Sequence, residues 1–246
     1  MKVSLSIIVL LLATIGRADA TDITACGQGV QTGDTGVLTT DLDCTVIVGD
    51  RGTLDFAGHT ITLSGANESV VCYGSCTLTG PGEITGAHTN SSDPGVIAAG
   101  VFVLGVRLTA QDLNIHDNDW GIAGQLRSVA ILKNVTVSDS VHSGIYLNAR
   151  VKGTNVTVSN SGEFGLLGSQ SVAMSGVTVT GSGMAGVISA SGRLVLRDST
   201  VTGNGGGTLD LLSPRRPKLK NTVCDHSAML NSDNSAGPPW GVCTQD

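Results

Sequence analysis

The sequence predicts an all-β fold, a parallel β-helix whose coils of about 21–23 residues stack into a solenoid. A short apolar segment recurs six times between residues 111 and 227, with central residues at intervals of 21 or 22, and a glycine before the next strand keeps nearly the same interval. One repeat cannot bury its apolar face until neighbours stack on it, so a fixed period predicts a solenoid. The central residues are Ile115, Val137, Val158, Val179, Val201 and Val223, and the glycines are Gly121, Gly144, Gly165, Gly186 and Gly207.

Within one coil, apolar residues occupy every second position, as they do in strands whose alternate side chains point to opposite faces. One coil contains three such short strands, at about 128–132, 135–138 and 144–147. No long segment has the 3.6-residue period of a helix, and the leucine skeleton of leucine-rich repeats is missing. Eight coils between residues 61 and 223 would form a rod of roughly 40 Å at the usual strand spacing.

The first 20 residues have the features of a signal peptide. Lys2 precedes an apolar run from 3 to 15, and Ala18-Asp-Ala20 is a small-residue cleavage signal. We therefore expect the mature chain, residues 21–246, to be secreted or periplasmic and to form a single domain. No later segment is apolar enough to suggest membrane insertion. The net charge of −6 argues against nucleic acid as a partner, and the oligomeric state is left open.

Six cysteines lie toward the two ends of the predicted solenoid, and none lies between residues 100 and 220. Export permits disulfides. Six cysteines allow many pairings, but pairing sequence neighbours closes the end coils with short loops. A zinc site is not expected, because no second pair of ligands stands at suitable spacing. The expected disulfides are Cys26–Cys44, Cys72–Cys76 and Cys224–Cys243, with end caps at about 21–56 and 224–246.

The segment Leu54-Asp-Phe-Ala-Gly-His-Thr-Ile61 opens the regular coils, and Gly-Ile-x-Leu and Val-Thr-Val-Ser segments recur after it. Through these motifs the chain resembles secreted right-handed parallel β-helix proteins of the pectate-lyase-like superfamily, over about residues 45–227. The resemblance implies a right-handed solenoid and a function directed at carbohydrate. That superfamily contains polysaccharide lyases, glycoside hydrolases, uronate epimerases and non-catalytic adhesins, and the fold alone does not choose among them.

Equivalent positions of successive coils lie about 4.8 Å apart, so a site is predicted as columns of residues that cross the coils. The predicted site has three parts. A column of polar residues lies in the turn, two residues before the repeated glycine. One outward residue follows on the next strand, and a pair of arginines lies in the turn after that strand. Together these residues predict a shallow groove. The candidate catalytic residues are His142, Tyr146 and Arg150, and the candidate substrate-binding residues are Arg127, Asp119, Glu163, Asp117 and Asp139.

This groove would suit an anionic polysaccharide, because arginines can hold a uronate carboxylate and stabilise the enolate that forms when its α-proton leaves. His142 between carboxylates is the expected base, and Tyr146 is the expected proton donor. β-Elimination and C5-epimerisation share this first step, so a polyuronate lyase or C5-epimerase is preferred to a hydrolase that uses two of the aspartates. No cofactor is expected; calcium on the aspartates is an alternative, but no ligand loop of recognised spacing supports it.

A non-catalytic surface, adhesive or binding rod is the competing hypothesis, because the turn columns of a solenoid are polar in any case. Leu167, Ile188 and Leu209 continue the outward column of Tyr146 with apolar residues. We expect residues 212–220 or a partner to cover this apolar column.

A third hypothesis is ice binding by a flat ladder of outward threonines, interrupted at His116 and Cys224. Threonine is also a good strand residue, which explains the ladder without any ligand. Asn67 and Asn90 stand in predicted loops and are the expected glycosylation sites, whereas Asn134 and Asn155 are expected to form a polar ladder in tight turns. The threonine ladder consists of Thr136, Thr157, Thr178, Thr200 and Thr222.

Overall fold

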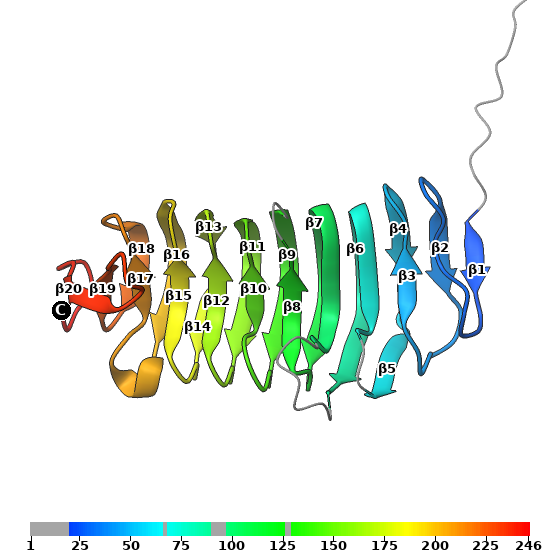
Figure 1. The fold of residues 1–246 in the computed structure, drawn as a ribbon, viewed down its shortest axis with the longest axis horizontal. Helices are drawn as coiled ribbons and strands as arrows, with labels where there is room; N and C mark the ends of the chain where they lie inside the picture. Colours follow the sequence, from blue (N-terminus) through cyan, green and yellow to red (C-terminus); the bar gives the residue numbers. More distant parts are fainter. Residues whose placement is uncertain (1–19, 66–67, 90–96, 126–128) are drawn as a thin grey trace, which may run out of the picture.

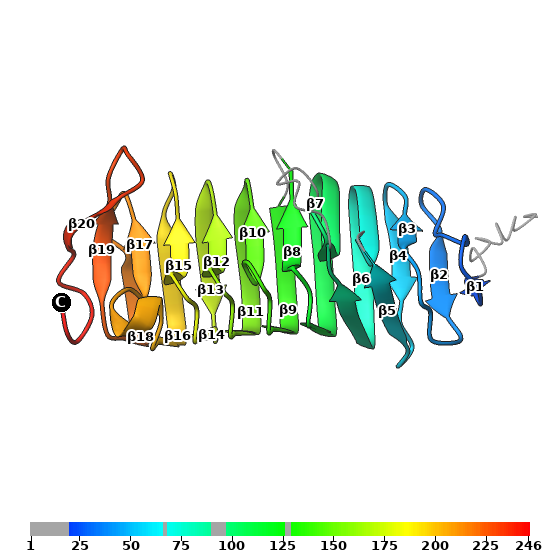
Figure 2. The same ribbon diagram turned by 60° about the horizontal axis from the view of Figure 1, so that its bottom comes forward.

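The computed structural model describes residues 20–65, 68–89, 97–125 and 129–246. They form a straight rod of stacked coils with the first and last described strands at its opposite ends (Figures 1 and 2). The predicted signal peptide before Ala20, the glycosylation candidates Asn67 and Asn90, and Arg127 lie outside the described residues.

The rod is a right-handed β-solenoid of about 8 turns of about 22 residues, which confirms the predicted fold. A right-handed connection is the favoured one between parallel strands. The strands are β1 (Thr21–Ile23), β2 (Thr35–Leu38), β3 (Val46–Val48), β4 (Gly52–Asp55), β5 (Thr60–Gly65), β6 (Val70–Ala87), β7 (Ala99–His116), β8 (Trp120–Gly124), β9 (Val129–Ser138), β10 (Ile145–Leu147), β11 (Arg150–Ser159), β12 (Phe164–Gly168), β13 (Ser171–Ser175), β14 (Thr178–Thr180), β15 (Ala185–Ser189), β16 (Leu194–Thr202), β17 (Leu211–Ser213), β18 (Lys218–Cys224), β19 (Ser227–Leu230) and β20 (Ala236–Pro239), and a 3-10 turn, η1, spans Gly205–Gly207.

The strands stack into three faces, each a column of parallel pairs one coil apart. Among the described residues only the β19–β20 pair is antiparallel. Face 1 contains β3, the starts of β6 and β7, and then β8, β10, β12, β15, β17 and β19. Face 2 contains β1, β2, β4, the middle parts of β6 and β7, the starts of β9, β11, β16 and β18, and β13. Face 3 contains β5, β14 and the ends of β6, β7, β9, β11, β16 and β18.

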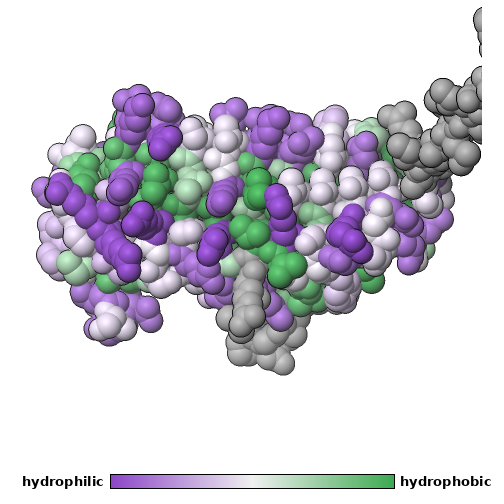
Figure 3. All heavy atoms as spheres, turned by 90° about the horizontal axis from the view of Figure 1, so that it is seen from above, coloured by the Kyte–Doolittle hydropathy of each residue, from purple (hydrophilic) through white to green (hydrophobic). Residues whose placement is uncertain are grey.

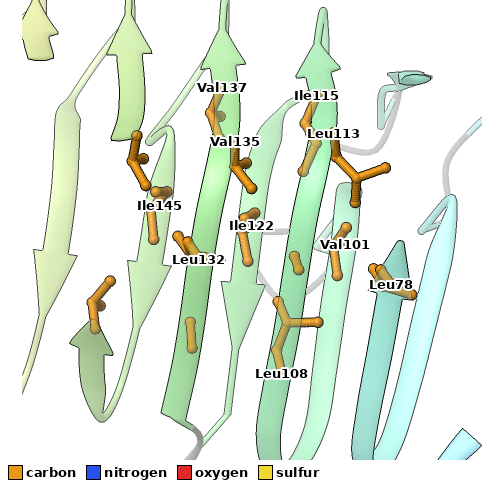
Figure 4. Packing of buried hydrophobic residues seen from close by; sticks show 14 of the residues in the cluster. Leu78, Val101, Leu108, Leu113, Ile115, Ile122, Leu132, Val135, Val137 and Ile145 are labelled. Carbon is orange, nitrogen blue, oxygen red and sulfur yellow. The ribbon is translucent and has the colours of Figure 1, made fainter. Parts of the chain in front are cut away.

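Apolar side chains fill the interior between the three faces. On face 3, Val137, Val158, Val179 and Val201 are fully buried and stand in register across four coils. Figure 4 shows how such side chains point inward from neighbouring strands. Burying a valine or leucine stabilises a fold by about 1.5–3 kcal/mol, so the repeated apolar positions hold the rod together coil by coil.

The bend from face 2 to face 3 needs one residue in the left-handed conformation. In β9 this residue is Asn134, with φ of 51°, and the strand runs through it from 129 to 138. The sequence therefore predicted the strand positions but placed a break where the structure has a bend. The same site holds Asn155 and Gly176 in the next coils, and the asparagines form the predicted ladder, since the Asn155 Nδ2 donates to the Asn134 Oδ1 at 3.1 Å.

Replacing Asn155 with alanine is expected to lower the free energy of unfolding by about 1–2 kcal/mol, the cost of a left-handed conformation for an ordinary residue. Its φ is 53°. Asn155→Gly, which copies Gly176 in the next coil, is the control and should lose less than half as much. Chemical denaturation measures both variants. An equal loss would assign the effect to the missing hydrogen bond instead of the backbone.

All three predicted disulfides are present, Cys26–Cys44, Cys72–Cys76 and Cys224–Cys243. The last one corrects the predicted orientation of β18. Cys224 is buried beside Val201, and Val223 is 53% exposed beside Thr200. The sequence repeat had placed Val223 in the core and Cys224 outside. The Cys224 side chain faces inward to bond Cys243, which shifts the last coil by one residue and ends the threonine ladder.

A second correction concerns the coil before it. Leu211 pairs with Val187 and Leu212 with Ile188, so Leu212, and not Leu209, continues the outward column of face 1. The turn η1 lengthens this coil by three residues, and Gly207 matches the glycine period without occupying the equivalent position.

Candidate functional site

The turn column Asp119, His142 and Glu163 stacks as predicted. The His142 N–H donates to the Asp119 carbonyl at 2.8 Å, and the Glu163 N–H donates to the His142 carbonyl at 2.9 Å. The side chains divide differently. His142 Nδ1 lies 3.2 Å from Glu163 Oε1, whereas the buried Asp119 carboxylate contacts His88 Nδ1 at 2.9 Å and accepts from the Thr89 N–H at 2.7 Å. The expected column of Asp119, His142 and Glu163 side chains is therefore divided into two pairs. His142 pairs with Glu163, and Asp119 pairs with His88.

An aromatic side chain that the sequence analysis did not single out joins this group. The Trp120 ring stacks on His142 with centroids 5.1 Å apart and meets Tyr146 edge-on at 5.0 Å. Trp120 opens β8, and Tyr146 is the central residue of β10 on the same face. His142, Tyr146 and Trp120 thus form one partly exposed cluster on face 1, with Glu163 holding one ring nitrogen of the histidine.

The other two predicted carboxylates lie toward face 3. Asp117 Oδ2 is 2.7 Å from His116 Nδ1, and Glu83 Oε1 is 2.7 Å from His116 Nε2. Asp139, in the next coil, accepts from the Asn160 amide at 3.0 Å, and hydrogen bonds from Asn160 and Ser138 lower its pKa. These carboxylates belong to a face 3 cluster centred on His116 and do not face His142.

Burial lowers the pKa of His116, but the hydrogen bonds and charges of Asp117 and Glu83 outweigh this effect and raise it above the ordinary value. A raised folded-state pKa contributes stability that is fully present below the unfolded pKa of about 6.5 and is lost as the pH rises through the folded value. The destabilisation caused by His116→Gln should therefore be larger at low pH than at high pH. Thermal melts from pH 5 to pH 9 test this, and a difference that grows with pH would contradict it.

Arg150 does not join the face 1 cluster. It begins β11 on face 2, where it lines an open hollow of about 410 Å³ with Arg107, Val129, Ile131, Ala149, Lys152 and Gln170. The hollow beside Tyr146 is a different one on face 1, of about 500 Å³ and mostly apolar. The predicted histidine, tyrosine and arginine thus lie on two adjacent faces that open in different directions.

Face 2 carries a charged surface much larger than the predicted arginine pair. From β7 to β18 its outward positions carry eight exposed cations. The same positions hold no aspartate, glutamate or aromatic residue. Among the described residues none of the eight forms an ion pair, whereas Arg51 pairs with Asp50 at 3.5 Å. We call this surface the basic face. Its cations are Arg107, Lys133, Arg150, Lys152, Arg193, Arg197, Lys218 and Lys220.

The apolar column of face 1 is covered in part by a segment other than the predicted one. Leu212 and Ile188 are nearly buried, and the wall over them includes Leu230, Asn234 and Ala236 from the C-terminal hairpin. Residues 214–217 instead form the turn that leads to face 2. Figure 3 shows hydrophobic surface over the C-terminal half of the rod, between groups of hydrophilic side chains.

The comparisons with known proteins agree with this architecture. The family described as right-handed beta helix region matches residues 99–237, more than half of the chain. The chain belongs to the right-handed β-helix family. No curated protein sequence matches it.

Two solved structures are similar to this β-helix protein. Full-length tailspike protein 2 from Escherichia coli O157:H7 bacteriophage CAB120 matches with a TM-score of 0.45 and 11% identity, over 86% of this chain and 36% of that chain. The enzymatically active domain of tailspike protein 2 from bacteriophage CBA120 matches with a TM-score of 0.43 and 11% identity, over 86% of this chain and 40% of that chain. The chain therefore spans less than half the length of either.

Two further findings bear on partners and location. Within the described ranges, no group of three or more His, Cys, Asp or Glu side chains is placed to hold a metal ion, and no helix is long and apolar enough to cross a membrane. The three disulfides are typical of a protein that matures outside the reducing cytoplasm.

Proposed function

We propose that this β-helix protein binds an anionic polysaccharide along its basic face. The observation that supports this is the set of eight exposed cations that have no carboxylate partner within the described part of the chain, on a protein whose net charge is −6. Charged side chains at a surface normally occur with both signs interspersed. A face that gathers cations and excludes acids, while the rest of the chain is acidic, fits a negatively charged ligand.

The shape of the face favours a long, extended ligand. Cations stand on most of the coils from β7 to β18, and equivalent positions of neighbouring coils lie roughly 4.8 Å apart. A chain laid parallel to the axis therefore meets several of them. Each exposed ion pair contributes little, about 0–1 kcal/mol, and binding needs several at once. The absence of aromatic side chains from these positions disfavours single-stranded nucleic acid, which is held largely by stacking.

The first test is a binding titration of the folded, disulfide-bonded protein with polyuronates, sulfated polysaccharides, neutral dextran and DNA, each with and without calcium. Binding to one or more anionic polysaccharides is expected, with a strong loss as salt screens the contacts. Dextran should not bind. No binding to any anionic polysaccharide, or tighter binding to DNA at equal charge, would overturn the proposal.

A second candidate is a lyase or C5-epimerase reaction at the face 1 cluster. The observation that favours it is the contact of Trp120 with both His142 and Tyr146. Glu163 holds His142 Nδ1, which leaves Nε2 to take a proton, and Tyr146 stands on the same strand face to return one. Arg150, the arginine expected to stabilise an enolate, lies on the basic face and is not part of the face 1 cluster.

The same polysaccharides can reveal this chemistry. β-Elimination creates an unsaturated end that absorbs in the ultraviolet, and epimerisation changes the proton spectrum at C5. A signal that His142→Ala abolishes, while binding to the basic face is retained, would establish catalysis. Turnover that survives both His142→Ala and Tyr146→Phe would remove this cluster from the reaction.

We also infer export of the chain, from the cleavage signal that ends at Ala20 and from the disulfides. Amino-terminal sequencing of protein recovered from an exporting host should give Thr21 as the first residue. Recovery of intact Met1 from the exported fraction would contradict the predicted cleavage.

A further inference from the structure

The basic face has an alternating pattern along its length. The first outward position of face 2 reads Arg107, Val129, Arg150, Ser171 and Arg193 in five successive coils. The three arginines are each 43 residues apart. They therefore recur at every second coil, a distance of roughly 10 Å along the rod, given about 4.8 Å per coil.

The surface is hollowed where the arginines are missing. The first hollow, of about 410 Å³, lies over Val129 and Ile131 and has Arg107 and Arg150 on its two sides. A second hollow, of about 400 Å³, lies over Ser171 and Ala173 and is bounded by Arg150, Lys152 and Arg193. Arginine ridges and uncharged hollows thus alternate, because small or short uncharged residues occupy the coils between the arginines.

We propose that the polysaccharide bound here carries its acidic group on every second sugar, with an uncharged sugar between. This inference rests on the proposed function. An extended β-linked pyranose chain advances by about one coil per sugar, so its acidic sugars would meet the arginine ridges while its neutral sugars fill the hollows. A polymer with a carboxylate on every sugar would place half of its charges over Val129, Ile131, Ser171 and Ala173, away from a paired cation.

One described cation between Arg107 and Arg193 lies on a coil whose described residues include no arginine. Lys133 lies on the coil of Val129 and Ile131, which holds the first hollow, but it stands at the third outward position, next to the bend toward face 3, and not in the arginine column. Arg127 precedes β9 and lies outside the described residues. Lys152 strengthens the central ridge, because it stands two residues from Arg150 on the same coil and lines both hollows. The alternation is therefore sharpest from Arg107 to Arg193.

The test compares two oligosaccharide probes that have the same number of carboxylates. Hyaluronan fragments alternate a uronate with a neutral acetamido sugar, and oligogalacturonates carry a uronate at every position. The folded protein is expected to bind the alternating probe about tenfold more tightly, a difference of about 1.4 kcal/mol. Both titrations are made at one low salt concentration.

Filling a hollow should change the preference. Ser171→Arg places a cation in the arginine column between Arg150 and Arg193, and we expect it to tighten oligogalacturonate binding and to bring the ratio of the two affinities close to one. Ser175→Arg is the matched control, since it adds the same charge to the same strand outside the column and should leave the ratio unchanged.

The outcomes separate the two proposals. Failure of both probes and of all other anionic polysaccharides would overturn the proposed function itself. Binding of both probes with equal affinity, or a ratio that Ser171→Arg and Ser175→Arg alter to the same extent, would leave the basic face as a binding site and overturn the alternating-charge inference. A preference for hyaluronan that only Ser171→Arg removes would support it.

Discussion

A protein with both Arg150→Glu and Lys152→Glu is expected to bind its anionic polysaccharide about 100-fold more weakly than the unmodified chain. Each change removes an attraction of about 0.5–1 kcal/mol and adds a repulsion of similar size, so the two together cost roughly 2–4 kcal/mol. The effect is large because both side chains lie on the central ridge and line both hollows of the basic face. Titration at low salt measures it, and the difference should shrink as salt rises.

The control must change the net charge equally elsewhere. Thr62→Glu, Thr136→Glu, Thr178→Glu and Val223→Glu together also lower the net charge by four, and all four side chains point outward from face 3. This fourfold variant should bind within about threefold of the unmodified protein when both are compared at about 0.1 M salt, where charges farther away than a Debye length of about 10 Å are screened. Equal weakening in both variants would mean that net charge, and not the basic face, controls binding.

The regular part of the fold could be predicted because each coil repeats the same physical problem. A strand that buries Val158 needs Val137 on one side and Val179 on the other, and this requirement appears in the sequence as a period. The prediction was wrong where another constraint acts. A disulfide turns Cys224 inward, and a three-residue insertion at η1 moves Leu212 into the position assigned to Leu209.

The candidate site was predictable in its columns but not in its side-chain partners. Stacking of His142 on Asp119 follows from the period, whereas the contact of Asp119 with His88 crosses the irregular coil before β7. The basic face left a visible signal, because Arg107, Arg150 and Arg193 are evenly spaced. The signal was missed because the turn glycines, rather than the outward strand positions, were used to align the coils.

The largest loss of stability is expected for Asp210→Ala. This carboxylate is 1% exposed and closes the irregular coil between η1 and β17. Its Oδ1 accepts from the Asn204 N–H at 3.2 Å and the Asn204 amide at 2.9 Å, and its Oδ2 accepts from the Asp225 N–H at 2.7 Å and the His226 N–H at 3.2 Å. Alanine would leave the backbone N–H groups of Asn204, Asp225 and His226 without this acceptor, while the Asn204 amide keeps the carbonyls of Val179 and Thr202, and we expect a cost of about 3–5 kcal/mol in the free energy of unfolding.

Denaturation of Asp210→Ala, Asp210→Asn and the exposed control Asp22→Ala measures this cost. Asparagine keeps one acceptor oxygen but turns an amide group toward two N–H donors, so we expect an intermediate loss, and Asp22→Ala should stay within about 0.5 kcal/mol of the unmodified protein. The loss should be confined to the C-terminal coils, because each coil of a solenoid contacts only its neighbours. Hydrogen exchange should therefore show β17 to β19 opening first while β9 to β11 stay protected, and uniform loss of protection along the rod would show that Asp210 supports more than its own coil.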